Sequence, residues 1–222
     1  MQYNLFVNYY LDKNPTRQQE LDFCIGENLK NESISFVVVV ATAEDYIKFW
    51  DNFCDYESKI MSVISADRPT YNHFFQLTRK MFGDTDNINI ISNSDMIIPQ
   101  ECIELLPLYI SNQATCLALS RWDAVQMKNY RLNAALFDRA DSQDTWIFKG
   151  GVPNINGADF TMGIAGCDNS IAHLLSAVGY NILNPAQTLK TYHIHLSNIR
   201  NYISGEVIDR VPPPYKLITP TT

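Results

Sequence analysis

The sequence predicts an α/β fold in which a mostly parallel central sheet is flanked by helices on both faces. Three observations support this prediction. Strand-like and helix-like patterns alternate along the first half of the chain. Residues 34–41 are apolar apart from Ser35, which is typical of a strand that is covered on both faces. The 222 residues are 46% hydrophobic, which is sufficient for one substantial core and favours a single domain.

Four strands are expected in the first half of the chain, at residues 4–10, 34–41, 59–66 and 88–92. Helical patterns separate them. The first helix is expected to begin with a capping box formed by Thr16 and Gln19. An aromatic face predicts a second helix over residues 43–53, and Pro69 fits the first turn of a third helix that stops near Gly83.

The second half of the chain is less regular. Three further strands are expected in it, at residues 116–119, 145–148 and 188–196. The polar residues 124–143 are interpreted as a loop over the cleft, and a last helix is expected to begin with Asp168 as its cap. A short helix or turn is expected at residues 198–202. Residues 1–210 then form one domain, and the Pro-rich residues 211–222 are typical of a linker to further domains.

The composition argues against several classes of protein. The formal net charge is −7, and the sequence contains no cluster of Lys or Arg. We therefore expect no nucleic-acid partner, because binding the phosphate backbone requires a basic surface. The longest apolar run, residues 36–43, is too short to span a membrane, and the first residues lack the pattern of a signal peptide. The five cysteines are scattered without metal-ligand spacing, which is typical of free thiols in a reducing compartment. We therefore expect a cytoplasmic protein that is not secreted.

Asp95 follows the most informative strand pattern in the chain. The apolar strand at residues 88–92 is followed by Asn93, Ser94 and Asp95 before apolar residues resume. In open α/β sheets ligands bind at the carboxyl ends of the strands, so Asp95 is expected at a binding cleft. A single carboxylate there suits a hard divalent cation that carries phosphates. An Asx-turn is the structural alternative for the same triplet.

His193 and His195 alternate along the last expected strand and therefore project from the same face. Either imidazole can ligate a metal. Together with Asp95 and the phosphates of a ligand, one of them would complete the octahedral shell of Mn²⁺ or Mg²⁺, and manganese accepts a nitrogen ligand more readily. The alternative is an edge strand that carries two solvated histidines.

Asp168 follows a glycine-rich approach at residues 163–167. A carboxylate that is held there and faces the cleft would serve as a general base, taking a proton from an attacking hydroxyl group. A helix cap is the structural alternative. The two roles are compatible if the start of the helix faces the substrate.

Residues after the first and third strands are candidates for nucleotide contacts. Arg68 would reach a phosphate or a base, and Asp67 a ribose hydroxyl group; a surface ion pair that caps the next helix is the alternative. Asn8, Tyr9 and Tyr10 would offer a wall to a nucleobase, with a place in the rim of the core as the alternative for the tyrosines.

Asp144, Trp146 and Lys149 are candidates for an acceptor pocket, because a tryptophan ring can stack on the face of a sugar. Packing in the core is the alternative for Trp146. Common nucleotide and hydrolase motifs are absent: the sequence contains no G-x-G-x-x-G after the first strand, no G-x-x-x-x-G-K-[ST] and no G-x-S-x-G. This absence argues against dinucleotide oxidoreductases, P-loop NTPases and hydrolases with a nucleophile elbow.

Over residues 4–202 the chain resembles the GT-A class of nucleotide-sugar glycosyltransferases, most of all the short members that large DNA viruses of algae encode to glycosylate their capsid protein. The resemblance is carried by the order of the Asn93-Ser94-Asp95 triplet, Asp168 and the His-x-His strand. It implies a GT-A fold and places Asp95 at the metal-binding carboxylate of the D-x-D motif. Asn93 replaces the first aspartate of that motif.

The same resemblance implies roles for the other candidates. Asp168 matches the catalytic acidic position, and one of His193 and His195 matches a late metal ligand. The residues that fall at or near the nucleotide contacts are Asn8, Tyr10, Asp67, Arg68, Asn93 and Ser94.

The sequence thus predicts a metal-dependent glycosyltransferase. It would move a sugar from a nucleotide-diphosphate donor, with a UDP-sugar expected, to a hydroxyl group of a glycan or glycoprotein. Inversion at the anomeric carbon is expected, and retention stays open. One alternative is a nucleotidyltransferase or sugar-phosphate pyrophosphorylase, which would normally carry a glycine-rich basic loop after the first strand. The other is a carbohydrate-binding module without activity.

Overall fold

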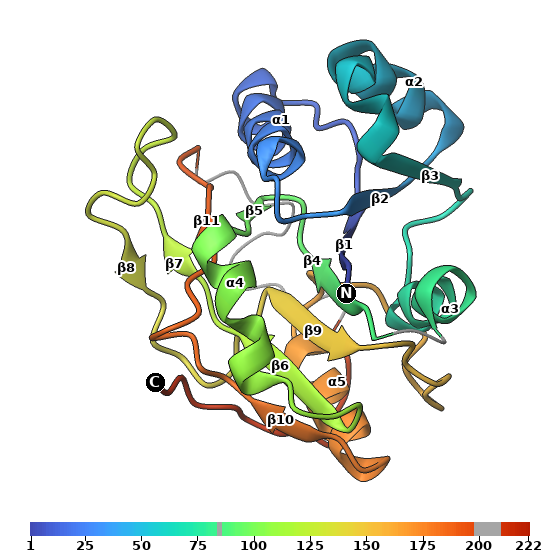
Figure 1. Cartoon of the computed structure of the whole chain (residues 1–222), viewed down its shortest axis with the longest axis vertical. Helices are drawn as coiled ribbons and strands as arrows, with labels where there is room; N and C mark the ends of the chain where they lie inside the picture. Colours follow the sequence, from blue (N-terminus) through green and yellow to red (C-terminus); the bar gives the residue numbers. More distant parts are fainter. Residues whose placement is uncertain (84–85, 198–209) are drawn as a thin grey trace.

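The computed structural model describes residues 1–83, 86–197 and 210–222. Within these residues it has a central sheet of seven strands in the order β10-β6-β9-β4-β1-β2-β3, flanked by helices (Figure 1). The strands of this sheet are β1 (Tyr3–Asn8), β2 (Phe36–Ala41), β3 (Ile60–Ile64), β4 (Ile88–Ser92), β6 (Thr115–Leu119), β9 (Thr145–Lys149) and β10 (Asn181–Leu183). β9 runs antiparallel to β4 and β6, and the other neighbours are parallel. The predicted α/β fold with a mostly parallel sheet is confirmed.

Helices cover both faces of the central sheet. They are α1 (Pro15–Lys30), α2 (Ala43–Phe53), α3 (Tyr71–Phe82), α4 (Gln100–Tyr109) and α5 (Cys167–Ala177), with a 3-10 helix η1 (Cys54–Lys59) after α2. Strand side chains alternate between two buried layers. Phe6 packs in the layer with α3 and α5, whereas Leu5 and Val7 pack in the layer with α1, α2 and α4. The apolar strand pattern therefore reflects burial on both faces.

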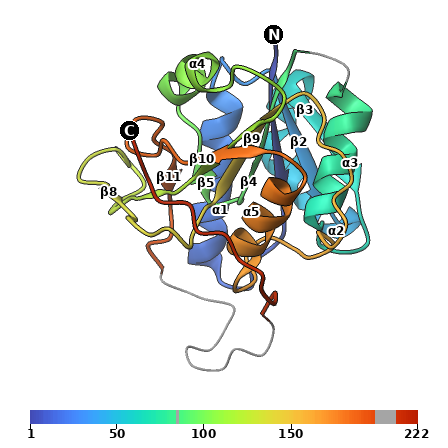
Figure 2. The same ribbon diagram turned by 90° about the horizontal axis from the view of Figure 1, so that it is seen from below.

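A small second sheet lies beside the central one. Its strands, in the order β5-β11-β7-β8, are β5 (Met96–Ile97), β11 (Tyr192–His193), β7 (Trp122–Asp123) and β8 (Ala135–Leu136). In Figure 1 and Figure 2, β8 and β11 lie on the side of the molecule away from α2 and α3. His193 pairs with Met96 on one neighbour and with Asp123 on the other. This sheet therefore brings three distant parts of the chain together.

Two helices begin at other residues than the sequence predicts. Asn14 caps α1, because its side chain accepts hydrogen bonds from the first backbone N–H groups of the helix; the capping box of Thr16 and Gln19 is wrong. Thr70 caps α3 in the same way, so Pro69 lies before the helix and not in its first turn. In both cases a polar side chain close to the expected start of the helix accepts hydrogen bonds from its free N–H groups and thereby sets where the helix begins.

The strand predicted at residues 188–196 is much shorter in the structure. Only β11 forms, because Thr188 and Leu189 donate instead to the carbonyl of Pro185 in a turn. The predicted loop at residues 124–143 contains β8. The helix or turn expected at 198–202 lies outside the described residues.

Residues 211–222 pack against the domain. The backbone N–H groups of Lys216 and Ile218 donate to the carbonyls of Asn169 and Ala140. The Ile218 side chain belongs to the core layer of α3 and α5. A connection from this segment to further domains stays a prediction.

All five cysteines are free thiols; Cys54 is exposed and the other four are buried. This confirms that they form no disulfide, while the reducing compartment stays a prediction. None of the described helices combines the length and the apolar character that a membrane span requires.

Candidate active site

A cleft opens at the carboxyl ends of the parallel strands, where the sequence predicts a ligand site. The predicted residues that line it are Asn8, Tyr10, Arg68, Asn93, Ser94, Asp95, His193 and His195. Arg17 and Arg121 line it as well. Three arginines and two imidazoles thus face one cleft in a chain whose net charge is −7. This local excess of basic groups suits an anionic ligand.

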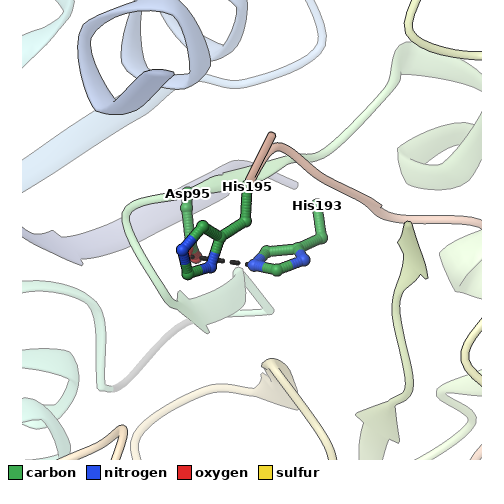
Figure 3. A group of neighbouring side chains, drawn as sticks. All are labelled: Asp95, His193 and His195. Carbon is green, nitrogen blue, oxygen red and sulfur yellow. Dashed lines mark hydrogen bonds and ion pairs between the residues drawn. The ribbon is translucent and has the colours of Figure 1, made fainter. Parts of the chain in front are cut away.

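Asp95, His193 and His195 form a compact group in this cleft (Figure 3). One ligand atom of each lies within 4.8 Å of the others. The group forms because β5 pairs antiparallel with β11, and the Ile194 N–H donates to the Asp95 carbonyl at 2.9 Å. The structure therefore brings together the three residues that the sequence suggests as metal ligands.

The two carboxylate oxygens of Asp95 have different surroundings. Oδ2 accepts hydrogen bonds from Arg17 Nη2 at 2.5 Å and from His193 Nε2 at 3.2 Å. Oδ1 is buried and has no hydrogen-bond partner among the described residues. A buried polar atom without a partner is costly, and a divalent cation would satisfy this oxygen. One carboxylate and two imidazoles are also a donor set that suits a divalent first-row transition metal, a class that includes Mn²⁺.

The charges of Asp95 and His193 depend on each other. Burial alone would raise the pKa of Asp95, but the adjacent His193 and Arg17 hold that pKa well below its usual range. Burial alone would lower the pKa of His193, but Asp95 and Asp123 raise it to about 9. His193 is therefore protonated at neutral pH in the metal-free protein. Its side chain is 11% exposed, so the alternative of a solvated histidine is wrong for this residue.

Asp123 orients the ring of His193. Its Oδ1 lies 2.8 Å from His193 Nδ1, which leaves Nε2 on the side of Asp95. A carboxylate behind the second ring nitrogen is the usual arrangement for a histidine that binds a metal. A cation at Nε2 would require that nitrogen to lose its proton.

Arg121 lines the cleft and pairs with Asp144. Arg121 Nη1 lies 3.0 Å from Asp144 Oδ2, and its Nε lies 2.8 Å from Asp123 Oδ1, so Arg121 connects Asp144 to the carboxylate that orients His193. The Asn93 side chain donates to Asp144 Oδ1 at 2.8 Å. Asn93 thus holds Asp144 in place, and its contact with a nucleotide stays a prediction.

Asp168 lies in the electrostatic reach of Asp144 rather than beside Asp95. It belongs to the first turn of α5, which follows Gly166 in a left-handed conformation with φ of 82°, so the prediction that Asp168 caps the helix is wrong. Burial and then the charge of Asp144 raise the pKa of Asp168 to about 7. Cys167 Sγ donates to Asp168 Oδ1 at 3.2 Å. Asp168 is not among the residues that line the cleft, but its pKa is suited to a general base.

Trp146 and Lys149 do not form an acceptor pocket with Asp144. Trp146 is completely buried, and its ring centroid lies 6.0 Å from that of Tyr71 on α3. Because β9 is antiparallel to β4, Lys149 lies at the opposite end of the sheet from Asp144, where it pairs with Asp86 at 3.1 Å. The predicted acceptor roles of Trp146 and Lys149 are therefore wrong, and Asp144 alone remains near the cleft.

Asn8 and Ser94 shape the rim of the cleft. The Ser94 hydroxyl group donates to the Asn8 carbonyl, and the Asn8 side chain donates to the Val40 carbonyl at 3.0 Å. The predicted wall of tyrosines is only half present. Tyr9 is buried in the core, and its hydroxyl group donates to Asp22 at 2.8 Å, whereas Tyr10 lines the cleft.

Asp67 and Arg68 line a hollow that adjoins the cleft and also contains Tyr10. The alternative in which they cap the next helix is wrong, because Thr70 caps it. Gly163 allows Arg68 to lie close: a Cβ atom at Gly163 would stand 3.0 Å from the guanidinium group, and its φ of +80° also favours glycine.

Several charged residues of the site are not identified by the sequence reasoning. Arg17 and Glu20 are almost fully buried and pair at 2.9 Å. A signal exists, because Arg17 stands four residues before Leu21 on the apolar face of its helix, where a charge is unusual. Arg121 and Asp123 follow a predicted strand end, which is also a signal.

No protein family model matches the chain, and no curated protein is significantly similar to it in sequence. Solved structures are similar in fold. A 4-diphosphocytidyl-2C-methyl-D-erythritol synthase is 15% identical, over 91% of this chain and 94% of that chain, with a TM-score of 0.50. TarS residues 1–349 of S. aureus, in complex with UDP-GlcNAc, are 12% identical, over 92% of this chain and 62% of that chain, with a TM-score of 0.50.

The mannosyltransferase PcManGT of Pyrobaculum calidifontis, in complex with GDP-Man and Mn²⁺, is 16% identical over 83% of this chain and 54% of that chain, with a TM-score of 0.48. The chain thus spans less than two thirds of the length of both glycosyltransferases. At such identities the first two likenesses show the fold alone. It is the fold of GT-A glycosyltransferases and related nucleotidyltransferases, which confirms the predicted fold class.

Proposed function

We propose that the protein is a metal-dependent glycosyltransferase that moves a sugar from a nucleotide-diphosphate donor to a hydroxyl group. The observation that carries the proposal is the buried, unpartnered Oδ1 of Asp95 beside two imidazoles in an arginine-lined cleft. This cleft lies at the edge of the sheet where open α/β folds bind ligands.

Arginines of the cleft would bind the donor. Arg68 and Arg121 are placed to hold diphosphate oxygens, for which the planar guanidinium group is well suited. The adjoining hollow with Tyr10 and Asp67 would take the nucleoside. We propose a UDP-sugar as the donor.

Asp95, His193 and His195 would hold a divalent cation, Mn²⁺ or Mg²⁺, which when bound would neutralise negative charge on the leaving nucleoside diphosphate. The nitrogen donors favour Mn²⁺. Asp123 supports this role by fixing the orientation of His193.

Asp168 is the proposed general base. Its carboxylate would take the proton of the acceptor hydroxyl group while the acceptor oxygen bonds to the anomeric carbon. The bond from that carbon to the diphosphate oxygen breaks, and the configuration inverts. A pKa of about 7 supports this role, because such a group is partly ionised at neutral pH and still accepts a proton readily. We propose a glycan or glycoprotein as the acceptor, and the resemblance suggests a viral capsid protein.

A panel of nucleotide sugars tests the proposal by thermal unfolding with and without Mn²⁺. A true donor at about 100 times its dissociation constant should stabilise the protein by about 2.7 kcal/mol. We expect a UDP-sugar to raise Tm only when Mn²⁺ is present, and a chelator to reverse the effect. Release of UDP that depends on an acceptor then shows transfer. If no nucleotide sugar raises Tm, or if a chelator has no effect, the proposal is wrong.

A nucleotidyltransferase is the second candidate, because the synthase with the same fold is covered over 94% of its length. Residues 9–14 after β1 argue against it, since they contain no glycine and a single lysine. Release of pyrophosphate from a nucleoside triphosphate and a sugar phosphate would favour this candidate. Absence of heat on titration with UDP and Mn²⁺ would instead favour a carbohydrate-binding module without activity.

A further inference from the structure

Arg17 connects the proposed metal ligands to α1. Its side chain is 7% exposed and lies in the first turn of the helix. Nη2 donates to Asp95 Oδ2, while Nη1 donates to Glu20 at 2.9 Å and to the Ile194 carbonyl at 3.0 Å. One guanidinium group thus joins α1, the turn before β5 and the segment after β11.

Glu20 extends this connection along the chain. Its side chain is 1% exposed and accepts from the backbone N–H of Ser197 at 2.6 Å and from the Ser197 hydroxyl group at 2.9 Å. Arg17 and Glu20 therefore hold Ile194, directly before His195, and Ser197, two residues after it. Charge-assisted hydrogen bonds in a buried place are strong, so this segment is held firmly.

We propose that Arg17 is a positioning residue for the metal site. By bonding to Oδ2 of Asp95 and to Ile194, it leaves Oδ1 as the oxygen that meets a cation and keeps His195 beside it. This inference rests on the proposed function, since it requires a cation at Asp95. The charge of Arg17 considered alone would have the opposite effect on cation binding. A guanidinium group next to a ligand carboxylate repels a cation, so without positioning its removal would tighten cation binding.

Calorimetric titration with Mn²⁺ alone tests the inference on the full chain. Arg17→Gln is expected to weaken Mn²⁺ binding about 10- to 100-fold, the range found for residues that orient metal ligands. Arg17→Lys keeps the charge, but its single nitrogen cannot stand at the positions of both Nη1, which bonds to Glu20 and Ile194, and Nη2, which bonds to Asp95, so it should also weaken binding. Glu20→Gln leaves the contact of Arg17 with Asp95 and is expected to weaken binding less.

Lys30→Gln is the matched control. It removes a positive charge from the same helix at an exposed pair with Glu27, and Mn²⁺ affinity should not change. A reversibly unfolded fraction raises the apparent Kd in inverse proportion to the folded fraction, so the folded fraction of each variant is measured by urea denaturation and its Kd is corrected for it. If Arg17→Gln does not fold, Arg17→Lys and Glu20→Gln decide the question.

Two outcomes overturn the inference in different ways. Tighter or unchanged Mn²⁺ binding by the folded Arg17 variants, with binding by the wild type intact, overturns the role of Arg17 alone. A wild type that does not bind Mn²⁺ overturns this inference together with the metal in the proposed function.

Discussion

Two carboxylates, Asp95 in the cleft and Asp168 outside its lining, are in opposite electrostatic states. Around Asp95, Arg17 and His193 supply opposite charges and hold its pKa far below the usual range. Around Asp168, burial and then the like charge of Asp144 raise the pKa to about 7. The same domain therefore holds an ionised carboxylate in the cleft, suited to a cation, and a second carboxylate outside the lining that can accept a proton.

The buried polar atoms around the two carboxylates also differ in how many lack a hydrogen-bond partner. Near Asp168, the Tyr71 hydroxyl group, Gln143 Oε1 and Asn169 Oδ1 have no hydrogen-bond partner among the described residues. At Asp95, Oδ2 accepts hydrogen bonds from Arg17 and His193, and only Oδ1 of the carboxylate has no partner among the described residues. The buried polar atoms around Asp168 are therefore less completely hydrogen-bonded than those around Asp95.

The largest effect is expected from Asp95→Asn. The substitution leaves Arg17 and His193 without their shared negative partner in a buried place. The free energy of unfolding of the metal-free protein should fall by about 3–5 kcal/mol, and Mn²⁺ binding should be lost. Urea denaturation at neutral pH and calorimetry measure the two effects. A change in stability below about 1 kcal/mol would show that these charges do not depend on Asp95.

Asp168→Asn should reduce sugar transfer by about 10²–10⁴-fold, the usual contribution of a general base. Donor binding in the presence of Mn²⁺ should stay at the wild-type level, because Asp168 lies away from the donor cleft. Steady-state kinetics and donor titration measure the two quantities. Full activity of the variant would remove Asp168 from the mechanism.

Asp168→Asn should increase the free energy of unfolding, whereas Asp95→Asn should decrease it. Because the pKa of Asp168 is raised from 3.8 to about 7, the folded protein keeps a proton that the unfolded chain releases. Its contribution to stability is complete below about pH 4 and is lost as the pH rises to about 7. Asp168→Asn should remove this loss, so it should gain stability relative to the wild type between about pH 4 and 7. A difference between the two proteins that does not vary with pH would contradict the raised pKa.

A third, smaller effect concerns His193 in the metal-free protein. Its pKa is raised from 6.5 to about 9, so its contribution to stability is complete below about pH 6.5 and is lost as the pH rises through about 9. The loss should amount to at most about 3 kcal/mol and should be absent in His193→Gln. Urea denaturation of both proteins across this pH range measures it. Parallel pH profiles of the two proteins would contradict the charge pairing of His193.

The smallest effect is expected from Lys149→Gln. Lys149 pairs with the exposed Asp86 at the end of the sheet away from the cleft, and such pairs contribute about 0–1 kcal/mol. Transfer kinetics should be unchanged within error. A clear rise in KM for the acceptor would show that Lys149 takes part in acceptor binding after all.

Local patterns were sufficient to predict much of the fold. The helix at residues 43–53 and the strand at 88–92 form as expected, because periodicity and burial are read within one segment. The triplet ending in Asp95 was also recognisable, since a polar stop after an apolar strand is a local feature. The predicted acceptor role of Trp146 fails because its alternating position in the strand, and not its proximity to Asp144, determines which buried layer its side chain enters.

By itself, the sequence determined the alternation of strands and helices and the polar residues at the carboxyl ends of the strands. Only the tertiary structure decided that β9 runs antiparallel, which brings Asp144 beside Asn93 at the carboxyl end of β4 and takes Lys149 to the opposite end. It also decided that Arg17 meets Asp95, 78 residues away, and that His193 lies between two carboxylates. Contacts of this kind depend on how separate elements pack, and no periodicity within a segment specifies the partner of a buried charge.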